Sequence, residues 1–247
     1  MNGQRHAAVT GAARGIGRAV AKRLARDGWT LSLFDRDEDG LRATADALDA
    51  LARLCDIRDP RAVDAAFDGA AAERGPFHAL AAVAGIGGPN ETGEIDRWDE
   101  LITTNLTGTY NCVRAFERSL ADGPASRHVV VVSSILARIG VPGYTGYSAS
   151  KAGLLGLVRS LAAEWAPRNV LVNAICPGWV ETDMAWLGLD ELPGTRDDAY
   201  AQVMRDVPLG RMAQPDEIAA TVAWLFSDDA RSITGQAIDQ NGGAFMA

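Results

Sequence analysis

The sequence has few of the residues that build disulfide frameworks and metal sites. Its 247 residues include three cysteines and three histidines, with no Cys-x-x-Cys or His-x-x-x-His spacing. Three cysteines that lie far apart, Cys55, Cys112 and Cys176, are typical of reduced thiols rather than of paired cystines. We therefore expect a cytoplasmic protein without disulfides, and we expect no metal site.

Long apolar runs and basic clusters are also missing. No apolar run approaches the roughly 18 residues of a membrane span, and the best candidate, residues 79–88, stops at Pro89. The N-terminal stretch MNGQRHAAVTG lacks the apolar core of a signal peptide and leads directly into a strand-like run. The net charge is −8 and no Lys/Arg block occurs. Because phosphate binding needs clustered basic side chains, we expect neither a membrane nor nucleic acid as a partner.

What the sequence does contain is an alternation of short apolar runs and longer amphipathic stretches. Hydrophobic residues make up 47% of the chain, enough for a sizeable core. Strands buried on both faces are predicted at 6–10, 30–34, 79–83, 128–133 and 170–175, with weaker candidates at 51–55 and 236–240. Helices are predicted near 16–27, 38–50, 60–73, 96–120, 148–166 and 215–227. This alternation predicts one α/β domain over residues 1–247, a doubly wound, Rossmann-type parallel sheet with helices on both faces.

Residues 181–208 fit neither pattern. The stretch is long for a connection between elements, and long connections over a sheet tend to be functional. We interpret it as a lid over a substrate site.

A glycine-rich turn follows the first predicted strand. The stretch TGAARGIG places Gly11, Gly15 and Gly17 at the start of a predicted helix. Glycines let the backbone turn tightly and approach a pyrophosphate, which binds the free amides of the following helix. The turn therefore indicates a dinucleotide site, although a plain strand-to-helix turn would have the same glycines.

Acidic residues after the second and third strands refine this prediction. Asp35 lies eighteen residues after Gly17, where an acid binds the adenosine ribose hydroxyls and repels a 2′-phosphate. Arg14 and Arg36 are close enough in sequence to favour that phosphate instead, so NAD is preferred and NADPH stays open. Asp56 is a candidate partner for the adenine amino group, or simply a helix-capping residue.

The stretch GYTGYSASKAG, residues 143–153, places Lys151 one helical turn after Tyr147. An unperturbed phenol has a pKa near ~10, and a neighbouring cation favours the phenolate and lowers that pKa. The pair indicates acid–base chemistry, but it could equally be an ordinary pair on a helix surface.

Taken together, the glycine turn, Asp35 and the stretch YSASK resemble the short-chain dehydrogenase/reductase family, and the similarity runs over essentially the whole chain. The resemblance implies that Tyr147 is the general acid/base, that Lys151 tunes it, and that Ser134, thirteen residues before Tyr147, orients the substrate oxygen. It also implies that Asn105 holds a water in a proton relay. The family usually has two asparagines where this chain has Ala82 and Val83.

The motifs and the resemblance together define the predicted sites. The cofactor site comprises Gly11, Arg14, Gly15, Ile16, Gly17, Asp35, Arg36, Asp56, Ile57, Ala84, Gly85, Tyr147, Lys151, Pro177, Gly178, Val180 and Thr182. The substrate pocket comprises Tyr144, Met184, Trp186 and Leu187.

The function expected from these sites is NAD-dependent hydride transfer between a secondary alcohol and a ketone. One alternative is an NADPH-dependent ketone reductase, including the 3-oxoacyl carrier type. A second alternative is a protein that senses NAD without turnover. The resemblance further implies a homotetramer acting on a small alcohol or ketone. The sequence indicates no role for the C-terminal segment Gln240–Ala247.

Overall fold

The computed structural model describes residues 5–90 and 96–246. Residues 1–4, 91–95 and 247 lie outside the described residues. These include the first four residues of the N-terminal stretch and the last residue of Gln240–Ala247.

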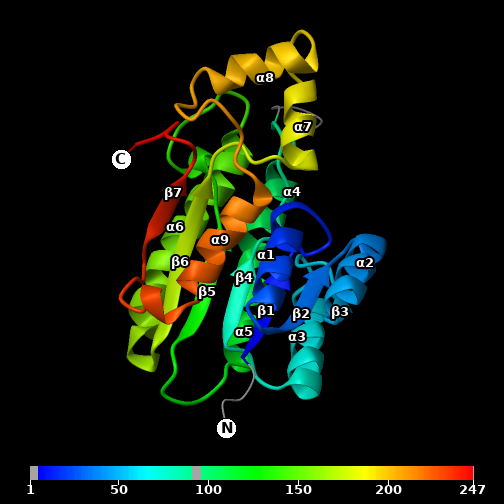
Figure 1. The fold of residues 1–247 in the computed structure, drawn as a ribbon, viewed down its shortest axis with the longest axis vertical. Helices are drawn as coiled ribbons and strands as arrows, with labels where there is room; N and C mark the ends of the chain where they lie inside the picture. The colour runs from blue at the N-terminus through cyan, green and yellow to red at the C-terminus, as the bar shows by residue number, and fades with distance from the viewer. Residues whose placement is uncertain (1–4, 91–95, 247) are drawn as a thin grey trace.

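Seven parallel strands form one sheet in the order β3-β2-β1-β4-β5-β6-β7 (Figure 1). Apolar runs with little alternation suit this arrangement because both faces of a parallel sheet are covered by helices. The doubly wound, Rossmann-type fold expected from the sequence is confirmed. The strands are β1 (His6–Thr10), β2 (Thr30–Asp35), β3 (Leu51–Leu54), β4 (Ala79–Ala82), β5 (Arg127–Val132), β6 (Val170–Pro177) and β7 (Ala237–Gln240).

Two hydrophobic cores lie on opposite faces of the sheet. One face packs against α1 (Gly15–Arg26), α2 (Glu38–Leu48) and α9 (Pro215–Leu225) through side chains such as Leu24, Leu41 and Val222. The other face packs against α3 (Pro60–Arg74), α5 (Thr109–Arg118) and α6 (Thr145–Trp165) through side chains such as Phe67 and Phe116. Helices on both faces leave the carboxyl edge of the sheet open for a ligand.

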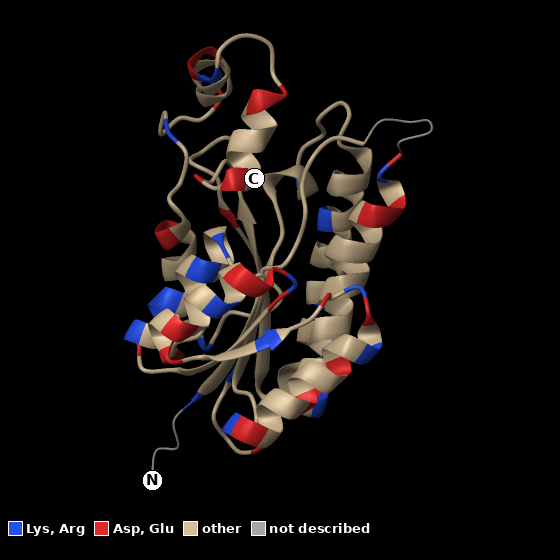
Figure 2. Cartoon of the chain, turned by 90° about the vertical axis from the view of Figure 1, so that its right-hand side faces the viewer, with Lys and Arg blue, Asp and Glu red and all other residues tan. Residues whose placement is uncertain are grey.

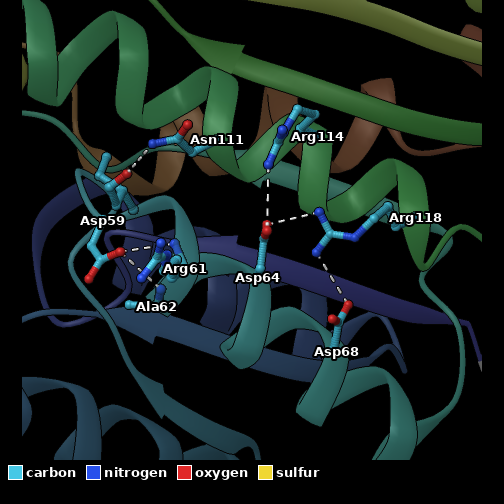
Figure 3. A network of polar contacts seen from close by, with 9 residues as sticks. Asp59, Arg61, Ala62, Asp64, Asp68, Asn111, Arg114 and Arg118 are labelled. Atoms are coloured by element: carbon cyan, nitrogen blue, oxygen red, sulfur yellow. Dashed lines mark hydrogen bonds and ion pairs between the residues drawn. The ribbon is translucent and has the colours of Figure 1, made fainter.

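Ion pairs join α3 to α5 at the edge of the second core (Figure 3). Asp64 bonds both Arg114 and Arg118 of α5, and Asp68 adds a second contact to Arg118. Exposed pairs of this kind contribute roughly 0–1 kcal/mol each, whereas burying a large apolar side chain contributes about 1.5–3 kcal/mol. The buried phenylalanines therefore hold these helices together more than the visible ion pairs do.

The helical stretch predicted near 96–120 is present, but it is not one regular α-helix. The segment consists of α4 (Trp98–Leu101), a wider π-helical stretch η1 (Ile102–Gly108), and α5. Wider turns of this kind are frequent at functional sites. Periodicity does not reveal such a turn because the apolar spacing on either side of it still reads as helix.

Residues 181–208 are also more ordered than the sequence indicates. They contain α7 (Asp183–Asp190) and α8 (Arg196–Met204), which pack around a small core of their own that includes Ala185, Leu189 and Met204. Capping residues start both helices, since Thr182 accepts from the amide of Ala185 and Thr195 forms a reciprocal pair with Asp198. In Figure 1 these two helices lie beyond the carboxyl ends of the strands.

Charged side chains are spread over the surface. Figure 2 shows Lys and Arg interspersed with Asp and Glu along the helices of this side, with no uniformly basic region in that view. Among the described helices, none is both long enough and apolar enough to cross a membrane.

Candidate active site

Ser134, Tyr147 and Lys151 converge at the carboxyl end of β5. Ser134 follows that strand, while Tyr147 and Lys151 lie one turn apart on α6. The Lys151 side chain is buried, and its Nζ lies 5.7 Å from the centre of the Tyr147 ring and donates a hydrogen bond to the Val132 carbonyl at 3.0 Å. Burial lowers the pKa of Lys151 to about 8. Lys151 therefore stays mostly cationic at neutral pH, as an acid–base site requires.

The pKa of Tyr147 differs from the sequence-based expectation. It is raised, chiefly because burial disfavours the phenolate; an interaction with the Ser134 hydroxyl lowers it and Tyr144 raises it further. The expectation that Lys151 makes the phenol more acidic is therefore wrong for this structure. Desolvation of the phenol outweighs a cation whose nitrogen is turned toward the Val132 carbonyl.

Asn105 is fully buried in the π-helical stretch η1. Its Oδ1 accepts from the Ile86 amide at 2.8 Å, and its Nδ2 donates to the Ile86 carbonyl at 3.0 Å and to Ser150 Oγ at 3.1 Å. Ser150 in turn donates to the Tyr147 carbonyl at 2.7 Å. Asn105 thus links the loop after β4 to the turn of α6 that carries Tyr147. Its proposed hold on a relay water stays a prediction.

The glycine turn has the close backbone contacts that a dinucleotide site needs. A Cβ on Gly17 would lie 2.0 Å from the Gly11 carbonyl oxygen, and one on Gly11, whose φ is +69°, would lie 2.8 Å from Ala84. Arg14 precedes α1 without supplying a side-chain cap, so the first amides of α1 face outward for an anion. Gly15, with φ of +53°, lies beneath Thr182. These close backbone contacts and the uncapped start of α1 are the features expected of a turn that binds a pyrophosphate.

Asp35 ends β2 next to this turn. Its Oδ2 accepts from the Ala13 amide at 2.9 Å and its Oδ1 from the Asp37 amide at 3.0 Å. Each carboxylate oxygen keeps a second lone pair, so two ribose hydroxyls can still donate to it. Arg14 and Arg36, the residues predicted to attract a 2′-phosphate, are both exposed.

The remaining adenine-side residues lie at the end of β3. The Asp56 carboxylate is bound by Arg58, with an Nε–Oδ2 distance of 2.9 Å, and this contact holds the pKa of Asp56 below its usual value. Ile57 is buried against Gly108, and its carbonyl accepts from Asn111 at 2.9 Å. To accept a hydrogen bond from an adenine amino group, the Asp56 carboxylate would have to bind the adenine and Arg58 at the same time.

The nicotinamide side of the predicted site is built from β4 and β6. A Cβ on Gly85 would lie 3.3 Å from Lys151 Nζ, so the backbone at Gly85 lies beside the Lys151 side chain. Pro177 ends β6, and the Gly178 amide donates to the Gln240 carbonyl at 3.2 Å. Val180 is buried, and the Thr182 hydroxyl bonds the Val180 carbonyl at 3.2 Å while capping α7.

The four predicted substrate-pocket residues have different surroundings. Tyr144 lies edge-on to Tyr147 with 6.5 Å between ring centres, and Met184 Sδ lies close to Gly87 in the loop after β4. Trp186 stacks on Tyr200 inside the lid core, and Leu187 is 65% exposed. The structure thus brings Tyr144 and Met184 to the site, whereas Trp186 packs against the small core of α7 and α8 and Leu187 is largely exposed.

Sequence reasoning missed two residues that shape the site. Asn90 and Ser150 are both buried and both bond the first turns of α6. Ser150 could have been found inside YSASK because it directly precedes Lys151. Asn90 carries no comparable signal, since its partners on α6 are more than fifty positions away. Across residues 5–90 and 96–246, no three His, Cys, Asp or Glu side chains come together as a metal site would need.

Comparisons with known proteins agree with this geometry. A family model described as enoyl-(acyl carrier protein) reductase matches residues 11–244. The chain is 35% identical to the 3-oxoacyl-[acyl-carrier-protein] reductase FabG of Escherichia coli (strain K12) over 244 residues, 97% of each chain. It is also 35% identical to the FabG of Staphylococcus aureus (strain N315), in an alignment of 255 positions that covers 100% of each chain.

Solved structures give the same result. A variant of actinorhodin polyketide ketoreductase with NADPH superposes with a TM-score of 0.91 at 33% identity, covering 98% of this chain and 97% of that one. A dehydrogenase/reductase from Sinorhizobium meliloti 1021 superposes with a TM-score of 0.87 at 33% identity, covering 98% and 95%. With the Ser134, Tyr147 and Lys151 constellation and a match over nearly its whole length, the chain belongs to the short-chain dehydrogenase/reductase family.

Proposed function

We propose that this protein reduces a ketone to a secondary alcohol with a nicotinamide cofactor, using Tyr147 as the proton donor. The observation that carries the proposal is the convergence of Ser134, Tyr147 and Lys151 in a fold that also has a close-packed glycine turn at the start of α1. The intact set argues against the alternative of a protein that only senses NAD. The printed names of the relatives, 3-oxoacyl reductases and a ketoreductase, support the reductive direction.

The side chains divide the chemistry between them. When bound, the nicotinamide supplies or accepts the hydride. Ser134 and Tyr147 donate hydrogen bonds to the substrate oxygen and so stabilise the charge that develops on it. The raised pKa keeps the Tyr147 phenol protonated at neutral pH, so it can give its proton to the forming alkoxide. The Lys151 cation, bonded to the Val132 carbonyl, lies 5.7 Å from the centre of the ring that then carries the negative charge.

We propose NADH as the preferred cofactor because of Asp35. Its carboxylate is anchored by two backbone amides at the end of β2, where the adenosine ribose would lie, and it would repel a 2′-phosphate there. The NADPH in the related ketoreductase structure favours the opposite choice for that protein. Arg14 and Arg36 are the residues through which this chain would accept NADPH.

A second candidate is the NADPH-dependent reduction of 3-oxoacyl groups on a carrier protein. The names of the FabG relatives favour it, and they support ketone reduction over alcohol oxidation as the main activity. The two candidates share the same catalytic residues and differ in cofactor and in the size of the substrate.

The lid and the assembly are part of the same proposal. We propose that residues 181–208 close over the substrate, since Met184 of α7 already contacts Gly87 beside the site. We also propose a cytoplasmic homotetramer. Trp98 and Tyr110 on the α4–η1–α5 segment are 43% and 47% exposed, as expected for aromatic side chains that a second subunit covers. Sedimentation as a 26.1 kDa monomer would contradict the assembly.

The decisive experiment is a cofactor and substrate screen of the purified protein. Oxidation of NADH and of NADPH would be followed with small ketones, cyclic and aryl ketones, 3-oxoacyl thioesters and 3-oxoacyl carrier protein. We expect ketone-dependent oxidation, faster with NADH. Binding of either cofactor without turnover on any ketone or secondary alcohol would contradict the proposed function. Turnover confined to NADPH and carrier-bound substrate would establish the second candidate.

A further inference from the structure

Asn90 is a buried side chain in the loop after β4, and only 5% of it is exposed. Its Oδ1 accepts from the Gly146 amide at 2.8 Å and from Thr145 Oγ1 at 2.6 Å. The backbone amide of Asn90 donates to the Gly143 carbonyl at 2.6 Å. All three contacts therefore lie in the four residues directly before Tyr147.

These contacts supply a cap that α6 does not make for itself. A helix begins with amides that have no partner inside the helix, and a side chain at the preceding residue usually accepts from the second or third of them. The residue at that position in α6 is Tyr144, which makes no side-chain cap bond. Asn90 takes its place from fifty-six positions away and accepts from the second amide, that of Gly146.

The approach of Asn90 depends on Gly146. A Cβ at Gly146 would lie 2.9 Å from Asn90 Oδ1 and 3.1 Å from Leu101 Cδ1. No larger residue fits there without moving Asn90 or Leu101. The glycine one position before Tyr147 thus allows the cap.

Asp96 fixes which way the Asn90 amide faces. Asn90 Nδ2 donates to Asp96 Oδ1, and the same oxygen accepts from the Trp98 amide at 2.9 Å. Because the Gly146 amide can only donate, the oxygen of Asn90 must point to α6 and its nitrogen to Asp96. The loop after β4, the start of α4 and the start of α6 are thereby joined through one side chain.

We infer that Asn90 is a positioning residue for the proton transfer: it caps α6 from outside and so sets where the Tyr147 phenol lies relative to Ser134. The inference rests on the proposed function of Tyr147. Without the cap, the first turn of α6 loosens and the phenol moves away from Ser134. A displacement of about 1 Å at a reacting group can reduce the rate about 100-fold.

The test exchanges the amide and the carboxylate between positions 90 and 96. Four variants are needed, N90A, N90D, D96N and the double variant N90D/D96N. N90A removes the cap, and N90D places a carboxylate against that of Asp96. In the double variant the carboxylate at position 90 again accepts from the start of α6, and the amide at position 96 donates to that carboxylate. The control D99N removes one negative charge from an exposed position of α4 and should behave as wild type.

We expect N90A and N90D to lower kcat by roughly 10- to 100-fold while the Kd of the cofactor stays the same. The apparent pKa of Tyr147 should rise in both variants, because its interaction with Ser134 is what lowers that pKa. The double variant should recover most of kcat and return the pH profile toward wild type.

Two results would overturn the inference. One is a wild-type kcat and pH profile in N90A. The other is a loss of rate in N90A and N90D that matches the loss of folded protein and is not recovered in the double variant. The Tyr147 titration can also be followed by tyrosinate absorbance against a Tyr147→Phe reference. It therefore tests the positioning role even if the wild-type protein reduces no ketone, a result that would count against the proposed function alone.

Discussion

The Asp35 carboxylate binds the backbone amide of Ala13 at 2.9 Å and so joins the end of β2 to the glycine turn. Its other oxygen holds the Asp37 amide at 3.0 Å, at the start of α2. Two backbone bonds leave this side chain little freedom, and its charge stays where a 2′-phosphate would arrive. One residue therefore shapes the turn, and under the proposed function we expect the same residue to discriminate between the two cofactors.

Asp35→Asn should shift cofactor preference toward NADP. Two unit charges about 4 Å apart interact by roughly 4 kcal/mol near a protein surface. With Arg14 and Arg36 offsetting part of this, we expect the wild-type preference for NAD to be about 2–3 kcal/mol, or roughly 30- to 150-fold in kcat/KM. The variant should lose most of it. The control Asp39→Asn makes the same charge change on the exposed side of α2. Equal use of NAD and NADP by the wild type would show that Arg14 and Arg36, and not Asp35, determine the cofactor preference.

Tyr147→Phe should abolish turnover and leave cofactor binding nearly intact. Removing a positioned acid–base group typically costs about 10²–10⁴-fold in rate. Tyr144→Phe is the matched control, since its ring lies 6.5 Å away and it is expected only to line the pocket. Steady-state rates and cofactor titrations would check both variants. Activity of Tyr147→Phe within a few-fold of wild type would contradict the mechanism.

Lys151→Met should inactivate the protein and stabilise its fold. Burial lowers the pKa of Lys151 to about 8, so at pH 7 the folded state holds a charge that it disfavours. This cost is present below pH 8 and falls as the pH rises from 8 toward the ordinary lysine value. Replacing a buried charge by an apolar side chain of similar size is often stabilising, and we expect about 1–2 kcal/mol after loss of the bond to Val132. Denaturant unfolding at pH 7 would measure it.

The control for that experiment is the only other lysine of the chain, Lys22, which is exposed on α1. Lys22→Met should leave both activity and the free energy of unfolding close to wild type. A Lys151→Met protein less stable than wild type would show that the bond to the Val132 carbonyl outweighs the cost of the buried charge.

This protein should unfold at a higher pH during acidification than its carboxylates alone would predict. His6 and His128 are buried at the amino ends of β1 and β5, and burial lowers the pKa of each to about 4. An unfolded histidine titrates near 6.5, so the stability that these neutral rings provide is complete above pH 6.5 and is lost as the pH falls toward 4. Between pH 7 and pH 5 we expect the free energy of unfolding to fall by about 2 kcal/mol for each of the two histidines.

His128→Leu should remove about half of this acid sensitivity. The Nδ1 atom of His128 is buried and finds no partner among the described residues, so an apolar replacement loses little at that atom. Free energies of unfolding at pH 7 and pH 5 would show the effect. An unchanged pH dependence in the variant would mean that other groups carry it.

Gly87→Val should weaken substrate binding by displacing the lid. A Cβ at Gly87 would lie 2.9 Å from Met184 Sδ and 3.2 Å from its Cγ. We expect KM for the ketone to rise about tenfold, as when a lid no longer closes, with the cofactor Kd unchanged. Met184→Ala in the same protein should recover part of the loss because it removes the clashing side chain. If KM does not recover in the double variant, the valine acts by disturbing the loop after β4 and not through Met184.

Much of this protein could be predicted from its sequence because the relevant signals are local. Apolar runs without alternation at 79–83 and 170–175 mark strands buried on both faces, and the structure has β4 and β6 there. The spacing of Tyr147 and Lys151 places them one helical turn apart in any helix. The glycine turn and Asp35 mark the cofactor end of the sheet in the same way.

Other features depend on contacts between distant segments, and only the tertiary structure decided them. The pKa of Tyr147 is raised because the fold desolvates the phenol, and spacing to a lysine says nothing about desolvation. Asn105 acts through a π-helical turn that periodicity cannot distinguish from an α-helix. Asn90 caps α6 across fifty-six positions, and such a partner becomes visible only when packing brings the loop after β4 against the start of α6.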